Sequence, residues 1–79
     1  MTKHEKEIII EEYKELKENN INLIGSSIVS FVEKSITEIN YMAQLMDKLG
    51  LSKEREQIDK EYKIIGDKRR KEIFPGMYN

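Results

Sequence analysis

Two glycine–serine junctions constrain this chain more than any other feature of its sequence. They read Ile24-Gly25-Ser26-Ser27 and Leu49-Gly50-Leu51-Ser52, and they divide the 79 residues into three segments of similar length. Glycine adopts the left-handed backbone conformation after a helix without a Cβ clash, and a serine hydroxyl can accept hydrogen bonds from the N–H groups of the next first turn. Each junction therefore predicts the end of one helix and the start of the next.

The predicted helices span residues 3–24, 27–49 and 52–73, and each would be about 33 Å long. Connections of two or three residues force consecutive helices to run antiparallel. Pro75-Gly76 ends the pattern and leaves a short apolar tail, 74–79. The sequence thus predicts a single all-α domain over residues 1–79, an antiparallel three-helix bundle that runs up, down and up and could associate into a larger helical bundle.

The apolar spacing agrees with this division. The first and third segments each carry one narrow apolar stripe at helical period, whereas apolar residues of the middle segment spread over about half of its circumference. We therefore expect segment 27–49 to pack between the other two. The middle set comprises Ile28, Phe31, Val32, Ile36, Ile39, Met42, Ala43, Leu45, Met46 and Leu49.

Three local alternatives remain open at this stage. Ile8-Ile9-Ile10 is β-branched and could form a strand, but charged neighbours and the absence of a second strand favour a helix. The first helix could end near Asn19 instead of Ile24, because asparagine prefers helix ends. Gly66 could break the third helix, although an isolated glycine costs only about 1 kcal/mol within a helix.

Several apolar residues do not fit the predicted seams between helices. A chain this short buries a small share of its surface, and without cysteine it has no disulfide to stabilise it. We therefore expect a homo-oligomer, or a protein partner, to bury part of this apolar surplus. The predicted partner-binding residues are Ile8, Ile10, Val29, Tyr41, Ile64, Phe74, Met77 and Tyr78.

Two polar residues lie on the apolar stripes. Asn20 continues the stripe of the first segment, and Arg69 continues that of the third. In the favoured interpretation, Asn20 is solvated at a frayed helix end, and Arg69 extends its guanidinium past the edge of the apolar stripe into solvent. The alternative makes Asn20 a core polar residue that sets helix register, as in coiled coils.

The chain has few residues that could catalyse a reaction or bind a cofactor. The chain has no cysteine or tryptophan, a single histidine, His4, and four isolated glycines. Neither a zinc motif nor a glycine-rich phosphate loop occurs. The abundant carboxylates fit a solvated ridge and helix-stabilising pairs such as Glu56 with Lys60, Asp59 with Lys63, and Asp67 with Lys71. We expect no enzymatic activity, no cofactor and no metal.

One end of the chain is locally basic, although the formal net charge is −1. Such side chains could neutralise nucleic-acid phosphates, which makes nucleic-acid binding the second hypothesis. The residues concerned are Lys60, Lys63, Lys68, Arg69, Arg70 and Lys71. No apolar run is long enough to span a membrane, and no signal sequence begins the chain, so we expect a cytoplasmic protein without a membrane partner.

The leading functional hypothesis is a non-catalytic interaction module, an adaptor, inhibitor or immunity-type protein. It would bind a protein partner through helix faces and the apolar tail, and it would also self-associate.

Overall fold

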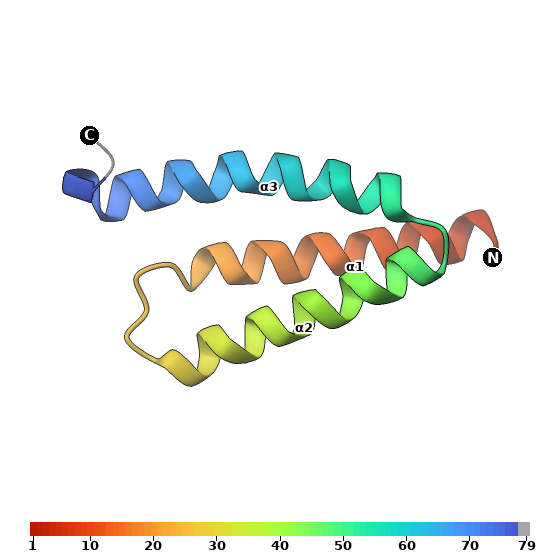
Figure 1. Ribbon diagram of the computed structural model, residues 1–79, viewed down its shortest axis with the longest axis horizontal. Helices are drawn as coiled ribbons and strands as arrows, with labels where there is room; N and C mark the ends of the chain where they lie inside the picture. Colours follow the sequence, from red (N-terminus) through yellow and green to blue (C-terminus); the bar gives the residue numbers. More distant parts are fainter. Residues whose placement is uncertain (78–79) are drawn as a thin grey trace.

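The computed structural model describes residues 1–77, with only the backbone of Met77, and shows three helices packed against one another (Figure 1). Helix α1 spans Lys3–Asn22, α2 spans Val29–Lys48, α3 spans Ser52–Ile73, and a short 3-10 turn, η1, covers Pro75–Met77. The predicted all-α antiparallel three-helix bundle is confirmed. The third helix runs through Gly66 without a break, and Ile8-Ile9-Ile10 is helical.

Local hydrogen bonds explain where the helices begin and end. At the start of α1, the Glu5 N–H donates to the Thr2 hydroxyl and the Thr2 N–H donates to the Glu5 carboxylate, forming a capping box. At the end of α2, the Leu51 N–H donates to the Met46 carbonyl, and Gly50 has a φ of 78°. This is the Schellman arrangement, which requires a left-handed residue.

The two junctions differ from the prediction in detail. Gly25 also has a positive φ, 88°, but it follows Asn22 by three residues, so the first connection is longer than expected. The predicted serine caps are wrong: neither α2 nor α3 has a side-chain cap, and Ser52 donates its hydroxyl proton to Asp47 instead. The α1 boundary at Asn22 lies between the two predicted alternatives.

The prediction that the middle segment is the shared wall is wrong. Helix α1 lies between α2 and α3, which approach each other near Gly50 and diverge toward the opposite end (Figure 1). The neighbouring helices therefore cover only part of the broad apolar face of α2. As a result, several large apolar side chains of α2 remain exposed.

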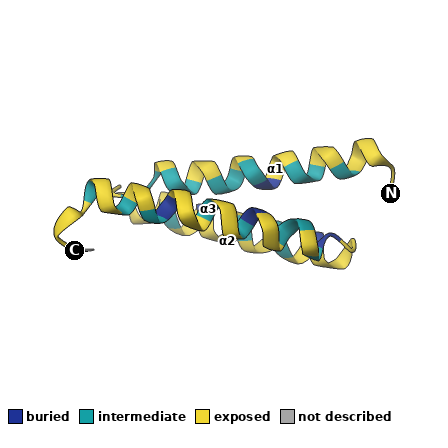
Figure 2. Ribbon diagram, turned by 90° about the horizontal axis from the view of Figure 1, so that it is seen from above, coloured by how far each residue is buried: buried dark blue, intermediate teal, exposed yellow. Residues whose placement is uncertain are grey.

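The core is small. Within the described residues, the buried apolar side chains are Tyr13, Met46, Leu51 and Ile58, and partly buried neighbours such as Ile39 and Tyr62 extend this cluster. Figure 2 shows the buried residues on the surfaces where the helices meet, and exposed residues over the rest of each helix. The molecule measures 45 × 25 × 17 Å, so little of it lies far from solvent.

Candidate functional site

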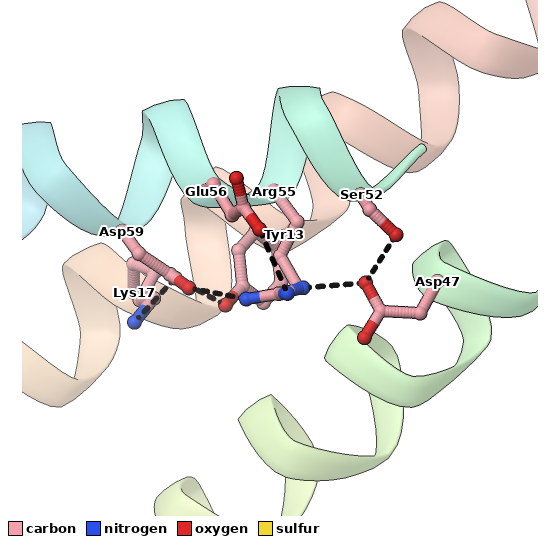
Figure 3. Close-up of polar contacts among 7 residues, drawn as sticks. All are labelled: Tyr13, Lys17, Asp47, Ser52, Arg55, Glu56 and Asp59. Atoms are coloured by element: carbon pink, nitrogen blue, oxygen red, sulfur yellow. Dashed lines mark hydrogen bonds and ion pairs between the residues drawn. The ribbon is translucent and has the colours of Figure 1, made fainter. Parts of the chain in front are cut away.

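A polar network joins all three helices near the junction of α2 and α3 (Figure 3). The Tyr13 hydroxyl on α1 donates to the Asp59 carboxylate on α3 at 2.5 Å, and Lys17 Nζ lies 2.9 Å from the same carboxylate. Arg55 bridges Asp59 at 2.8 Å and the Asp47 carboxylate of α2 at 2.6 Å. Each helix therefore contributes at least one side chain to a continuous set of hydrogen bonds and ion pairs.

The network shifts the ionisation of its members. Burial and the hydrogen bond to Asp59 raise the pKa of Tyr13 well above its usual value, so the phenol stays protonated. Burial alone would raise the pKa of Asp59, but hydrogen bonds from Tyr13, Lys17 and Arg55 outweigh this effect and hold that pKa below its usual value. A phenol that keeps its proton and a carboxylate surrounded by donors are stabilising groups, not a general base poised near neutral pH.

These contacts replace the ion pairs that the sequence predicted. Asp59 pairs with Lys17 and Arg55, not with Lys63, because α1 brings Lys17 to the inner side of α3. Asp67 pairs with Arg70 at 3.2 Å, and Glu56 lies 4.0 Å from Arg55. Among the described residues, no group of three or more histidine, aspartate or glutamate side chains could hold a metal ion.

Asn20 and Arg69 differ in their surroundings. Asn20 is half-buried and donates from Nδ2 to the buried Ser35 hydroxyl of α2 at 3.2 Å. The favoured interpretation of Asn20 as a frayed, solvated end is therefore wrong, because α2 covers this part of α1. Arg69 is exposed, with its guanidinium 3.9 Å from Glu72, as the solvation interpretation predicted.

A groove runs between α1 and α2, and we call it the α1/α2 groove. It consists of two adjoining hollows of about 420 Å³ and about 230 Å³, which share Leu16 and Glu38. The hollow beside Tyr41 is almost entirely apolar, whereas the hollow beside Phe31 also has polar walls. Tyr41 and Phe31, which are 71% and 55% exposed, lie in different hollows. The complete lining is Leu16, Asn19, Leu23, Phe31, Lys34, Ser35, Thr37, Glu38, Tyr41 and Met42.

The structure does not bring the predicted partner-binding residues together. Tyr41 lines the α1/α2 groove, Ile8 lies on the acidic outer face of α1, and Ile64 is 72% exposed on α3. Ile10 packs against the core cluster, so it is less available than predicted. Val29 and Phe74 are exposed, whereas the Met77 side chain and Tyr78 lie outside the described residues.

The sequence does not predict that Leu16, Leu23, Phe31 and Met42 line an exposed groove. Their helical spacing places each of them on an apolar stripe, which is ordinarily buried. The available signal was the width of the α2 apolar face, which exceeds what one neighbouring helix can cover.

Five of the six basic side chains of α3 share one half of the helix. At 100° per residue, Lys60, Lys63, Lys68, Arg70 and Lys71 point in directions that span about 160°, and only Arg69 points away from them. Arg70 pairs with Asp67, and its guanidinium lies 3.2 Å from the position that a Cβ on Gly66 would occupy. Asp67 points into the same half of the helix, so its carboxylate offsets part of this positive charge.

No known family model, curated protein or solved structure matches this chain. None of the helices that the structure describes combines the length and the apolar character needed to cross a membrane. The class of protein that the structure supports is a small all-α bundle.

Proposed function

We propose that this chain is a non-catalytic protein–protein interaction module and that the α1/α2 groove is its contact surface. The observation that carries this proposal is the groove itself, which has the exposed aromatic residues Phe31 and Tyr41 in its walls and is almost entirely apolar in the hollow beside Tyr41. Aromatic side chains dominate the energetics of protein interfaces, and an apolar groove between two helices suits a third helix.

The groove differs from scattered surface hydrophobes because its residues are contiguous. Single exposed apolar side chains are common on soluble proteins, but contiguous apolar patches mark contact surfaces. Ile64 provides the contrast within the same molecule: it is as exposed as Tyr41 but is not part of the groove lining.

The test is site-specific photo-cross-linking in the cells that make the protein. A photoreactive phenylalanine analogue replaces Tyr41 in one variant and Ile64 in a matched control, because the two side chains are 71% and 72% exposed. We expect discrete protein adducts from position 41 and few from position 64. Equal yields at the two positions, or no adduct from position 41, would contradict the proposal.

Nucleic-acid binding through α3 remains the second prediction from the sequence. Because Asp67 lies among the basic side chains and pairs with Arg70, this face of α3 gives it less support than the groove gives to protein binding. A mobility shift at low salt that disappears on charge reversal of Lys68 and Lys71 would favour it. A cytoplasmic location likewise stays a prediction.

A further inference from the structure

We infer that the partner in the α1/α2 groove is a second copy of this chain, bound across a two-fold axis with the two α2 helices antiparallel. This inference rests on the proposed function and specifies the occupant of the groove. Three observations support it: the exposed area of the chain, the pattern of residues along the groove, and the small size of the core.

The exposed area matches what a dimer interface would bury. A folded monomer of 9.4 kDa typically exposes about 5000 Å², whereas this chain exposes 5924 Å². The excess is about 900 Å². A specific interface of standard size buries about 800 Å² on each partner, so one such contact would remove the excess.

The groove wall on α2 is self-complementary in sequence. Phe31 and Tyr41 lie equally far from residue 36, and so do Lys34 and Glu38. Because these four residues recur at helical spacing, they share one side of α2. A two-fold axis at the level of residue 36 would therefore place each Phe31 against Tyr41 of the second copy, and each Lys34 against Glu38 of the second copy.

The charges at the rim favour this antiparallel arrangement. Within one chain, Lys34 Nζ and the Glu38 carboxylate are 4.0 Å apart and largely exposed, so their mutual contact contributes little. In the antiparallel pair each charge would meet an opposite charge from the second copy. A parallel pair would place like charges together, and like-charge contacts oppose association.

The small core favours a second copy of the chain over a different protein as the occupant of the groove. Only Tyr13 and Met46 are large side chains with almost no exposure in the described part of the chain. Domains of this size usually need an additional source of stability, and self-association supplies one whenever the protein is present. The dimer would cover Leu16, Phe31 and Met42 and so extend the core across the two-fold axis.

The sharpest test uses two charge-reversed variants, Lys34→Glu and Glu38→Lys, alone and mixed. Each variant alone would place like charges across the axis twice, and we expect its dimer to dissociate about tenfold more readily than that of the wild type. In the mixture every contact of this kind would again join opposite charges. Sedimentation velocity with one variant fluorescently labelled should therefore show preferential heterodimers. Mixing restores no attraction within either chain, so it reports the contact between chains alone.

Two further variants provide the controls. Tyr41→Glu buries a charge at the interface and should abolish the dimer, whereas Ile64→Glu changes an equally exposed residue on α3 and should leave it intact. Circular dichroism confirms that each variant stays helical. A variant that unfolds is replaced by the milder Tyr41→Ser, for which the same loss of dimer is expected.

Three results would overturn the inference: a wild-type monomer at high micromolar concentration, loss of the dimer in Ile64→Glu but not in Tyr41→Glu, or no heterodimer on mixing. Position 41 adducts with other proteins, together with a monomeric wild type, would leave the proposed function standing and remove only the second copy. The absence of any adduct at position 41, including one with the chain itself, would remove both.

Discussion

Tyr13 is the residue on which the packing of the three helices depends most. Its ring is 1% exposed in the core, and its hydroxyl donates to Asp59, which also contacts Lys17 and Arg55. A buried tyrosine whose hydroxyl has a partner combines apolar burial with a directed hydrogen bond.

Replacing Tyr13 with phenylalanine should therefore lower the free energy of unfolding by about 1–2 kcal/mol, because the ring stays buried while Asp59 loses one donor. Urea denaturation followed by circular dichroism measures this change. Tyr41→Phe is the matched control, because it keeps the ring that the groove contact would use and removes a hydroxyl from a residue that is 71% exposed in the single chain. It should change stability by less than about 0.5 kcal/mol. Equal effects of the two substitutions would contradict the role given to the Tyr13 hydroxyl.

The depressed pKa of Asp59 predicts a loss of stability in acid. The folded-state pKa is lower than the unfolded value of about 3.9, so the ionised carboxylate stabilises the fold above that pH. This stabilisation is lost as the pH falls below about 4, through the folded-state pKa. Asp59→Asn should therefore be less stable than the wild type by about 1–2 kcal/mol at pH 7.

The difference between the wild type and Asp59→Asn should shrink as the pH falls from 5 toward 2. Thermal denaturation across this pH range measures it. Glu54, whose pKa is also lowered but by contacts outside this network, remains in both proteins and cancels in the comparison. A difference that does not depend on pH would show that the Asp59 contacts do not act through its charge.

At the scale of the helices, a hydrogen bond joins α1 to α2. Asn20 donates to Ser35, and Ser35 is 8% exposed. Asn20→Leu should lower the free energy of unfolding by about 1–2 kcal/mol, because the Ser35 hydroxyl would stay buried without this donor. Adding Ser35→Ala should recover most of the loss, since both polar groups are then removed. Chemical denaturation of the single and double variants would decide; a more stable single variant would contradict the prediction.

The two junction glycines differ in what surrounds them. A Cβ on Gly50 would meet no atom within 4 Å, whereas a Cβ on Gly25 would lie 3.2 Å from Ile73 Cγ2. Gly50→Ala should therefore cost only the backbone strain of its positive φ, about 1 kcal/mol. Gly25→Ala should cost about 1 kcal/mol more, because Ile73 must also move. The melting temperatures of the two variants test this order, and a larger loss at Gly50 would contradict it.

The sequence was sufficient to predict the three helices and their antiparallel order, but not which helix is central. Gly25, Gly50 and Pro75 mark boundaries through local backbone preferences, which do not depend on distant residues. The choice of central helix depends on how side chains from all three helices fill space together, and the broad apolar face of α2 suggested the wrong helix. The same face has an explanation in the structure, where part of it lines an exposed groove.

The polar network shows a similar limit. Asp59 and Lys63 have the spacing of a helical ion pair, yet Asp59 binds Tyr13 and Lys17 from a helix more than forty residues earlier in the chain. Such contacts depend on the rotation of α1 against α3, which no local pattern specifies. The groove residues Leu16, Leu23 and Met42 could not be recognised from the sequence either, because they follow the helical spacing of core positions.

At the scale of the whole molecule, the structure combines a small core with a large exposed area. A bundle measuring 45 × 25 × 17 Å leaves one side of the α1/α2 pair without a covering helix, and Phe31 and Tyr41 lie there. We propose that this groove is a contact surface and that a second copy of the chain covers it.

The most direct measurement is a dilution series of amide NMR spectra of the wild type, from high to low micromolar concentration. We predict that concentration-dependent shifts concentrate at the groove residues Leu16, Phe31, Lys34, Glu38 and Tyr41, while the outer face of α3 around Ile64 stays unchanged. Two results would contradict this proposal. One is a set of spectra that do not change with concentration, from a protein that remains a 9.4 kDa monomer throughout. The other is a set of shifts centred on Ile64.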